Sequence, residues 1–228
     1  MENYDFEAGE VILIDKPLEW TSFDVVLKIR NLLTKKLKRK KLKVGHAGTL
    51  DPLASGLLIV CTGKKTKEIQ DFMGLPKQYT AEITVGATTP SYDLETEPVP
   101  FDNAKPLTEE LIQEHLGAFT GLIEQMPPAF SAKKIKGKKA YDLAREGKEV
   151  ELKKAFVSIH ELTVRNVGEN TFELDVHCSK GTYIRSLAHD LGQAMGTGAY
   201  LSGLRRTAIG PFTTEDAMSV DEFVKNIG

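Results

Sequence analysis

The sequence of 228 residues has few cysteines, no long hydrophobic run and almost no excess of charge of either sign. Its two cysteines, Cys61 and Cys178, lie in apolar stretches, which is typical of reduced buried thiols and unlike a disulfide scaffold or a metal cluster. No apolar run approaches the ~20 residues of a transmembrane helix. The N-terminal segment is acidic before its first apolar residues and lacks the pattern of a signal peptide. We therefore expect a cytoplasmic protein that does not enter a membrane.

Motifs for metals and nucleotide cofactors are also missing. The five histidines do not pair with one another or with a cysteine at the spacing of metal ligands. The sequence GKKT at 63–66 is similar to the end of a phosphate-binding loop, but Leu58 stands where that loop needs glycine. The sequence GTGAYLSG at 196–203 has Leu201 in place of the third glycine of a dinucleotide fingerprint. We therefore expect neither a metal nor a cofactor.

The net charge of −2 hides a strong separation of charge along the chain. The stretch 25–50 has no acidic residue, a second basic stretch lies at 133–148, and the segment 93–124 between them is acidic. The basic residues of the first stretch are Lys28, Arg30, Lys35, Lys36, Lys38, Arg39, Lys40, Lys41 and Lys43. One basic run is often only a solvated surface, but two runs with an acidic counterpart elsewhere favour a polyanionic partner.

Hydrophobic patterns predict a mixture of strands and helices. VILID at 11–15 and GLLIVCTG at 56–63 are short apolar runs typical of buried strands, and YTAEITVG at 79–86 alternates as a strand does. Thr21 and Ser22 can cap a helix whose apolar residues recur near helical spacing. The first third of the chain is therefore expected to supply both sheet and helix.

The rest of the chain continues this mixture. LTEELIQEHLGAF at 107–119 predicts a helix, and the runs at 152–166 and 171–179 predict a hairpin with one buried face. GTYIRSLAHDLGQAMG predicts a helix that ends at Gly196, and AYLSGLRRTAIG predicts a strand before a short C-terminal helix. Strands and crossover helices do not alternate regularly. The sequence therefore predicts an α+β fold, with a mixed, largely antiparallel central sheet flanked by helices and loops.

The segment GHAGTLDPLASGLL at 45–58 holds the residue with the strongest case for chemistry, Asp51. An aspartate before proline is usually a turn former, and that interpretation accounts for the dipeptide by itself. Three observations favour a reactive role. Asp51 directly precedes a buried strand, Gly45 and Gly48 would let a ligand come close, and the preceding lysines would deliver a phosphate backbone.

This segment also closely resembles the catalytic motif of the TruB family of tRNA pseudouridine synthases. Further blocks resemble the same family, in the same order, along nearly the whole chain. They are DKPLEWTSFD at 15–24, KQYTAEITVGATT at 77–89, MPPAFSAKKIKGKKAYDLAR at 126–145, CSKGTYIRSLAHDLG at 178–192 and YLSGLRRTAIGPF at 200–212. The resemblance implies the pseudouridine synthase fold, and the isomerisation of uridine to pseudouridine at position 55 in the T loop of tRNA.

The resemblance also implies roles for individual residues. Asp51 would be the nucleophile that lets uracil detach from N1, rotate and reattach through C5, while Tyr79 stacks on the flipped base and Arg185 pairs with Asp51. The residues implied to line the uridine pocket or to hold the splayed loop are His46, Tyr183 and Leu204. One carboxylate could reach either C6 of the base or C1′ of the ribose, and the sequence leaves that choice open.

These roles agree with what the chemistry needs. A nucleophilic carboxylate must be ionised, and a guanidinium within ~4 to 6 Å lowers its pKa, which suits Arg185. A flipped base loses stacking, and an aromatic face such as Tyr79 restores ~1 to 3 kcal/mol of it. Taken singly, Arg185 could equally be a surface charge and Tyr79 a core residue.

The sequence departs from the family pattern at two places. Leu18 and Glu19 replace the usual polar residue and glycine. Pro90 and Ser91 replace the usual Asp-Thr pair and leave Asp93 as the matching acid. The role of Asp93 is therefore open.

For organisation, the resemblance implies a single catalytic domain over 1–228, with an RNA-binding thumb inserted at about 121–150 that carries Lys133, Lys134 and Lys136. We expect no C-terminal PUA domain, a monomer, the T arm of tRNA as the partner and no obligatory protein partner. Two alternatives stay open: a pseudouridine synthase for another RNA loop, and a non-catalytic module that binds RNA or helps tRNA fold.

Overall fold

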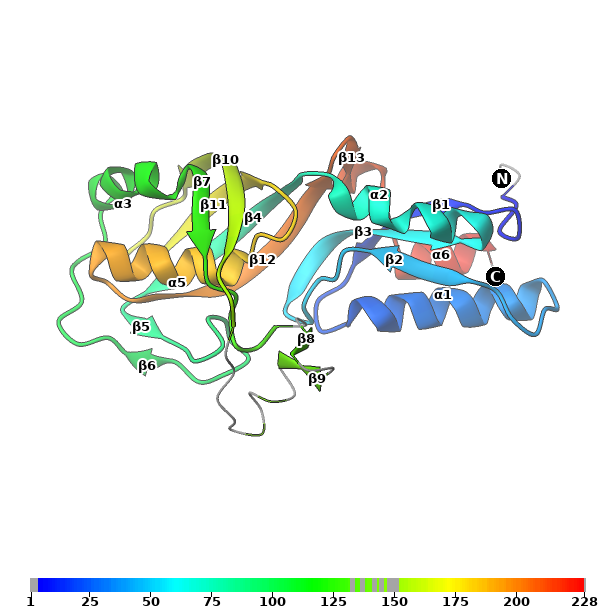
Figure 1. Cartoon of the computed structure of the whole chain (residues 1–228), viewed down its shortest axis with the longest axis horizontal. Coiled ribbons are helices and arrows are strands. Elements are labelled where there is room, and N and C mark those ends of the chain that lie inside the picture. Colours follow the sequence, from blue (N-terminus) through cyan, green and yellow to red (C-terminus); the bar gives the residue numbers. More distant parts are fainter. Residues whose placement is uncertain are drawn as a thin grey trace. The chain divides into compact units, whose positions relative to one another are not determined.

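The computed structural model of the chain describes residues 4–131, 134–135, 138–140, 143, 146 and 152–227. Its contacts divide into two compact units, one formed by Met1–Tyr79 with Leu204–Gly228 and the other by Thr80–Gly203. Strands β4 (Lys77–Val85) and β12 (Ala199–Ile209) contribute residues to both units. Figure 1 labels most helices and strands of each unit.

The first unit is built from elements that come from both ends of the chain. They are β1 (Val11–Lys16), α1 (Ser22–Lys36), β2 (Val44–Ala47), β3 (Ala54–Thr62), η1 (Gly63–Glu68), α2 (Ile69–Gly74), β13 (Phe212–Thr213), η3 (Thr214–Asp216), β14 (Met218–Ser219) and α6 (Val220–Ile227). The two strands predicted from short apolar runs are confirmed as β1 and β3, and the short C-terminal helix is confirmed as α6.

Helix α1 begins where the sequence predicted. The Thr21 hydroxyl accepts a hydrogen bond from the backbone N–H of Asp24 at 3.0 Å, and the Asp24 carboxylate accepts one from the backbone N–H of Thr21 at 2.9 Å. This capping box satisfies backbone donors that the first turn leaves without partners. The hydrogen bonds from Thr21 also lower the pKa of Asp24. At the other end, Lys35 and Lys36 complement the helix dipole.

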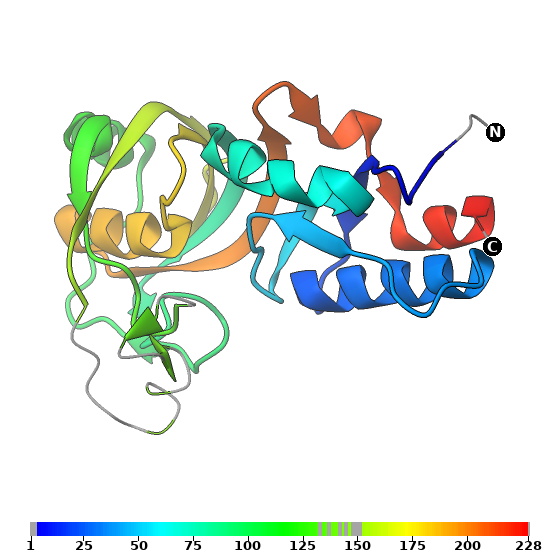
Figure 2. The same ribbon diagram turned by 45° about the vertical axis from the view of Figure 1, so that its right-hand side comes forward.

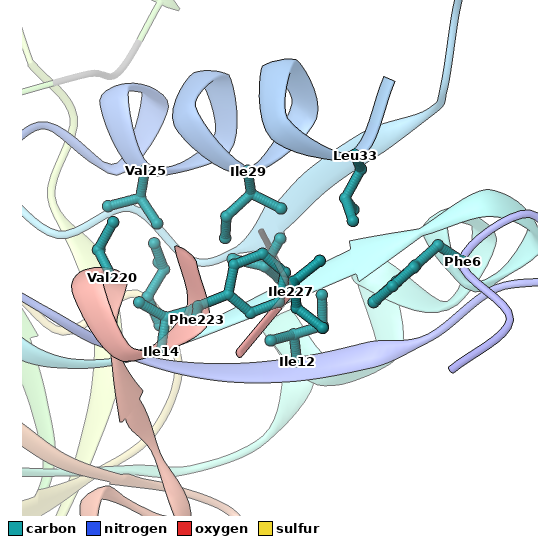
Figure 3. Packing of buried hydrophobic residues seen from close by; sticks show 11 residues of the cluster. Phe6, Ile12, Ile14, Val25, Ile29, Leu33, Val220, Phe223 and Ile227 are labelled. Atoms are coloured by element: carbon teal, nitrogen blue, oxygen red, sulfur yellow. The ribbon is translucent and has the colours of Figure 1, made fainter. Parts of the chain in front are cut away.

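Alternate residues of β3 pack on opposite faces of the sheet in the first unit. Leu58 and Val60 join a cluster with β1, α1 and α6, whereas Leu57 and Ile59 join a second cluster that includes side chains of α2. Figure 3 shows the first cluster, in which the labelled side chains are Phe6, Ile12, Ile14, Val25, Ile29, Leu33, Val220, Phe223 and Ile227. Helices α1 and α6 lie side by side over it (Figure 2). Because β3 is covered on both faces, its sequence is a continuous apolar run.

The second unit contains a hairpin and two helices that the sequence predicted. Its elements are β5 (Ala87–Thr88), β6 (Val99–Pro100), α3 (Glu109–Leu116), η2 (Gly117–Phe119), β7 (Gly121–Gln125), β8 (Lys134–Ile135), β9 (Lys138–Lys139), β10 (Ala155–Arg165), β11 (Thr171–Cys178) and α5 (Ile184–Met195). Strands β10 and β11 pair in antiparallel fashion, and Phe172, Leu174 and Val176 of β11 are buried. Helix α5 ends at Gly196 in the left-handed conformation, as predicted.

The strands form a mixed sheet in each unit. The order is β14-β1-β3-β12 in the first unit, with β2 on β3 and β13 on β12, and β12-β4-β11-β10-β7 in the second. The pairs β1–β14 and β12–β3 are parallel, whereas β1–β3, β2–β3, β12–β13, β10–β11 and β10–β7 are antiparallel. The predicted α+β fold with a mixed, largely antiparallel sheet is confirmed. The single catalytic domain with its thumb stays a prediction, since part of 121–150 lies outside the described residues.

Replacement of Gly56 by alanine is expected to destabilise the first unit. Gly56 has φ +103°, and an added Cβ would lie 2.2 Å from the carbonyl oxygen of Arg206 on the neighbouring strand β12. Strain and overpacking together should lower the free energy of unfolding by about 3 kcal/mol or more. Thermal melting measures the effect. Gly74→Ala is the matched control, because nothing lies within 4 Å of the added Cβ there; equal melting temperatures for both variants would contradict the prediction.

Candidate active site

The loop that carries Asp51 is fixed to the start of α1. The Leu50 backbone N–H donates to the Ser22 hydroxyl oxygen at 2.8 Å, and the Ser22 hydroxyl lies 3.1 Å from the Leu50 carbonyl oxygen, both contacts being buried. The Asp51 carbonyl accepts a hydrogen bond from the backbone N–H of Ala54, the first residue of β3, at 3.1 Å. Asp51 itself is half-buried. Its backbone is therefore held from both sides while its side chain keeps some exposure.

A fully buried arginine ties this loop to the sheet. Arg206 of β12 donates from Nε to the Leu57 carbonyl at 2.8 Å and from Nη2 to the Gly48 carbonyl at 3.1 Å. Gly48 has φ +90°, a conformation that favours glycine. At Gly45, a Cβ would lie 2.8 Å from Cδ1 of Ile69, the end of a side chain that would have to shift to make room.

A buried lysine lies close enough to Asp51 for their charges to interact. Lys16 at the end of β1 has no exposed surface, and its Nζ donates to the carbonyls of Pro17 at 2.8 Å and Trp20 at 2.6 Å. Burial lowers the pKa of Lys16 to about 8, the negative charge of Asp51 acts in the opposite direction, and the charge of Arg206 lowers it further. Sequence reasoning missed both cations, although each lies within a block that resembles the family.

The other residues predicted for the first unit lie on its strands. His46 on β2 pairs with Val60 of β3, and burial is the main cause that lowers the pKa of His46, with the nearby charge of Arg206 adding to it. Leu204 on β12 pairs with Ala54, just after the Asp51 loop. Tyr79 is half-buried on β4. His46 and Leu204 thus belong to strands that pair with β3.

The predicted residues of the second unit lie at the start of α5. Tyr183 is the N-cap residue, and the buried side-chain amide of Gln125 makes two hydrogen bonds with its backbone. Gln125 Oε1 accepts from the Tyr183 N–H at 2.8 Å, and Gln125 Nε2 donates to the Tyr183 carbonyl at 3.0 Å. Gln125 thus holds the backbone of Tyr183, a contact that sequence reasoning missed because the two residues lie far apart in the sequence.

Arg185 is buried, with 5% of its surface exposed, so it is not a surface charge. Its Nη1 lies 3.3 Å from Oδ2 of Asp93, which is also 5% exposed, and its Nη2 donates to the Phe130 carbonyl at 2.9 Å. The position of Asp93 is therefore settled despite the departure at Pro90 and Ser91. The predicted pairing of Arg185 with Asp51 joins residues of different units and stays a prediction.

Part of the first basic stretch lines a pocket of about 830 Å³ in the first unit. The basic residues of this pocket are Arg30, Lys40, Lys41 and Lys43, and its polar residues are Asn31, Thr34 and Thr66. Other cations of the stretch have partners elsewhere: Arg39 pairs with Glu7, and Lys36 donates to the Ile227 carbonyl. We call the set Arg30, Lys40, Lys41 and Lys43 the basic pocket.

The thumb lysines are only partly covered by the structure. Lys133 and Lys136 lie outside the described residues, and Lys134 is a residue of β8, which pairs with β9.

Both cysteines are buried, and burial raises the pKa of the Cys61 thiol to about 11. Over the described ranges, no three His, Cys, Asp or Glu side chains are grouped as metal ligands. In the same part of the chain, no helix has the length and apolar character needed to span a membrane.

Comparison with protein families matches the sequence from residue 34 to residue 227. Residues 34–184 match the model of the TruB family pseudouridylate synthase N-terminal domain, and residues 185–227 match the tRNA pseudouridylate synthase B C-terminal domain. The chain belongs to the TruB family. Asp51, Tyr79 and Tyr183 fall within the first match, and Arg185 and Leu204 within the second.

TruB relatives of similar length support this assignment. A tRNA pseudouridine synthase B from Parabacteroides distasonis is 53% identical over 218 residues, which cover 96% of this chain and 93% of the relative. One from Flavobacterium johnsoniae is 46% identical over 224 residues, with 98% of both chains covered.

Solved structures share the TruB fold of this chain. A crystal structure of a Cbf5-Nop10-Gar1 complex matches with a TM-score of 0.72 and 29% identity, and an H/ACA RNP bound to a substrate RNA containing 2'-deoxyuridine matches with 0.68 and 28%. Both matches cover 96% of this chain but only 54% and 53% of the other. This chain thus spans about half the length of the chains in those structures.

The buried charge of Lys16 is expected to make stability rise with pH. The folded-state pKa of about 8 lies below the ordinary value of 10.5, so the unfolded chain binds the proton more tightly. Below pH 8, Lys16 is charged in both states, so the folded protein carries the full free-energy cost of burying this charge. As the pH rises from 8 toward 10.5, the folded protein loses the proton first, and the free energy of unfolding should increase by up to about 3 kcal/mol. Urea unfolding of the wild type and of Lys16→Met between these pH values measures the difference.

Subtraction of the Lys16→Met curve removes the titration of all other groups that the two proteins share. Lys28→Met, at an exposed position of α1, is the matched control and should follow the wild type throughout. A constant difference between wild type and Lys16→Met across the range would contradict the expected titration.

Proposed function

We propose that this protein converts uridine 55 in the T loop of tRNA to pseudouridine with Asp51 as the nucleophile. The reaction itself is that of the TruB family, and relatives at about 50% identity along nearly the full chain carry the name tRNA pseudouridine synthase B. The observation that carries the residue assignment is a half-buried carboxylate, on a loop fixed at both ends, beside the buried cation Lys16.

The reaction is a rearrangement that needs no external reductant or oxidant. The glycosidic bond from N1 of uracil to C1′ breaks, a bond from C5 to C1′ forms, and the proton of C5 is lost while N1 gains one. A carboxylate that adds covalently to the nucleoside keeps the detached uracil in reach while it turns. Because the base must leave the stack of the T loop, the site must also recognise a flipped nucleotide.

The surroundings of Asp51 favour its ionised form. A positive charge on Lys16 stabilises a carboxylate in a partly desolvated site, and Lys16 cannot turn away, because two carbonyl acceptors hold its ammonium group. We assign Arg185 as a second cation for Asp51. Its burial and its fixed acceptors, Asp93 and Phe130, give the guanidinium the defined orientation that a catalytic partner needs.

The remaining pocket residues are assigned by the same proposal. Tyr79 stacks on the flipped uracil, where an aromatic face replaces lost base stacking. Tyr183 and Leu204 line the uridine pocket, and His46 holds the splayed loop. The backbone clamp of Gln125 supports the assignment of Tyr183, because it fixes the point at which the side chain leaves α5.

We further propose that tRNA is held by its phosphates at two places. One is the basic pocket, and the other is the thumb with Lys133, Lys134 and Lys136. Phosphate contacts of this kind position an RNA without reading its sequence. In this proposal the chain acts as one catalytic domain, as a monomer without an obligatory protein partner, in the cytoplasm. A module that only binds RNA would need the lysines but not an acid beside a buried Lys16.

Asp51→Asn is expected to abolish pseudouridine formation while tRNA still binds. The amide has the shape of the acid but is not a nucleophile, so release of tritium from tRNA labelled at C5 of uridine should stop. Affinity for tRNA should stay within about tenfold, ~1.4 kcal/mol. Asp71→Asn, at an exposed position of α2, is the control and should keep full activity. Tritium release by Asp51→Asn at the wild-type rate would end the nucleophile assignment.

The same assay separates the alternative functions. Release should occur from a tRNA transcript with an intact T loop and stop when uridine 55 is replaced. Activity only on a different RNA loop would support the other pseudouridine synthase. Binding without release from any RNA would support the non-catalytic module.

Removal of the three lysines of the basic pocket is expected to weaken tRNA binding and its salt dependence together. The variant Lys40→Ala, Lys41→Ala, Lys43→Ala should lose up to three phosphate contacts, so the slope of log K against log salt should decrease in magnitude by about 2. Equilibrium binding at several salt concentrations measures it.

A control variant that loses the same number of positive charges separates the effect of the pocket from the effect of net charge. The variant Lys65→Ala, Lys154→Ala, Lys225→Ala removes lysines outside the pocket, two of which pair with Glu68 and Glu124 at 2.9 Å. Its salt slope should match that of the wild type. The same slope for both triple variants would exclude the basic pocket as a phosphate site.

A further inference from the structure

Helix α5 presents two side chains to the same segment of the second unit. Arg185 and His189 are four residues apart and therefore lie on one face of the helix. Asp93 contacts Arg185, and Tyr92 contacts His189. Asp93 Oδ2 lies 3.3 Å from Arg185 Nη1, and the rings of Tyr92 and His189 stack with centroids 3.9 Å apart and planes 14° apart. The segment is thus attached to the helix at two points, one helical turn apart.

Tyr92 holds an unusual backbone conformation at this point. Its φ is +65°, in the left-handed region that a bulky residue rarely adopts. Such a conformation is strained and persists only where the surroundings determine it. The stack with His189 is a contact that this conformation makes available. The backbone strain therefore lies at the residue next to Asp93.

Hydrogen bonds hold Tyr92 and Asp93 within one turn, in which the Tyr92 backbone N–H donates to the Thr89 carbonyl at 3.2 Å. The Tyr92 carbonyl accepts from the backbone N–H of Leu201 at 3.0 Å. The hydroxyls of Thr89 and Ser91 both donate to the Asp93 carbonyl, at 2.8 Å and 3.0 Å. Thr89 thus bonds to Tyr92 through its carbonyl and to Asp93 through its hydroxyl, and because the two residues share this anchor we expect a shift of Tyr92 to move Asp93.

The Arg185 guanidinium has acceptors inside and outside the turn around Tyr92: Nη1 faces Asp93 Oδ2 and the Ser91 carbonyl, and Nη2 donates to the Phe130 carbonyl. Two of these acceptors belong to the turn, so a rotation of the turn about its ion pair would displace both of them. A second contact further along the same helix face removes that rotation. The stack supplies it, since flat rings packed face to face resist sliding and tilting.

His189 is suited to such a purely steric contact. Its Nδ1 is buried and has no hydrogen-bond partner within the described residues, so the face of the ring is the interaction that the structure records for it. Burial also lowers the pKa of His189, which favours the neutral ring. A ring of similar shape without nitrogen should therefore serve as well.

We propose that Tyr92 and His189 are positioning residues, whose stacked rings set the place of Asp93 and through it the orientation of Arg185 in the active site. The inference rests on the proposed role of Arg185. It assigns function to a pair of residues within the second unit.

The test compares loss of the flat ring with its retention. His189→Leu and Tyr92→Leu keep much of the packed volume but remove the stack, and single-turnover tritium release from T-loop tRNA should slow by about tenfold or more. His189→Phe and Tyr92→Phe keep the stack and should stay within about threefold of the wild type. Affinity for tRNA should not change in any of them. Leu94→Ala, an exposed residue of the same segment, should have no effect.

A double-mutant cycle separates positioning from a general structural role. In an Asp93→Asn background, the added His189→Leu change should cost less than about twofold, because the pathway from the stack to Arg185 is already broken. Thermal melting of each variant accompanies the rates.

The positioning role is overturned if the leucine variants react at the wild-type rate, if phenylalanine is no better than leucine, or if the His189→Leu loss is complete in the Asp93→Asn background. It is also overturned if the leucine variants melt below the assay temperature, because the stack is then structural. A wild-type protein that releases no tritium would instead overturn the proposed function.

Discussion

The buried guanidinium of Arg206 is the contact on which the arrangement around Asp51 depends. It reaches from β12 to a carbonyl of β3 and to the Gly48 carbonyl at the start of the Asp51 loop. A charge without exposed surface is costly unless its donors find acceptors, so neither carbonyl can move away without loss. The same strand approaches so closely at Gly56 that no Cβ fits there. The loop is therefore preorganised before any RNA arrives, and substrate binding need not order it.

The chain uses its positive charges in two different ways. Lys16, Arg185 and Arg206 are buried, and each is held by backbone carbonyls, so their positions are fixed and little screened by salt. The lysines of the basic pocket line an open surface, where they suit a mobile polyanion with salt-dependent affinity. In the proposed function, the charges that orient a reacting carboxylate must keep one geometry, whereas the charges that hold a phosphate backbone must tolerate many. Burial is the property that separates the two classes.

The sequence predicted what local patterns control. The Thr21 cap, the apolar run of β3 and the alternation in β11 are encoded by neighbours in the chain, and the structure confirms each. It did not predict that Lys16 is buried, or that Gln125 clamps Tyr183, because these depend on partners that only the folded chain brings together. A basic run gave no means to tell pocket lysines from those with other partners. The resemblance supplied candidate residues, but no local signal supplied their contacts.

The departure at Pro90 and Ser91 illustrates how a motif can change while its geometry is kept. The family pattern left Asp93 as a lone matching acid, yet its carboxylate reaches Arg185 and its carbonyl accepts from the Ser91 hydroxyl. The strained backbone conformation of this turn is at Tyr92, where φ is positive, and the ring of His189 stacks on the ring of Tyr92. The turn that departs from the family pattern still places a carboxylate against Arg185 of α5. The role of a residue beside a motif, such as Tyr92 here, is therefore best inferred from the backbone conformation that it stabilises.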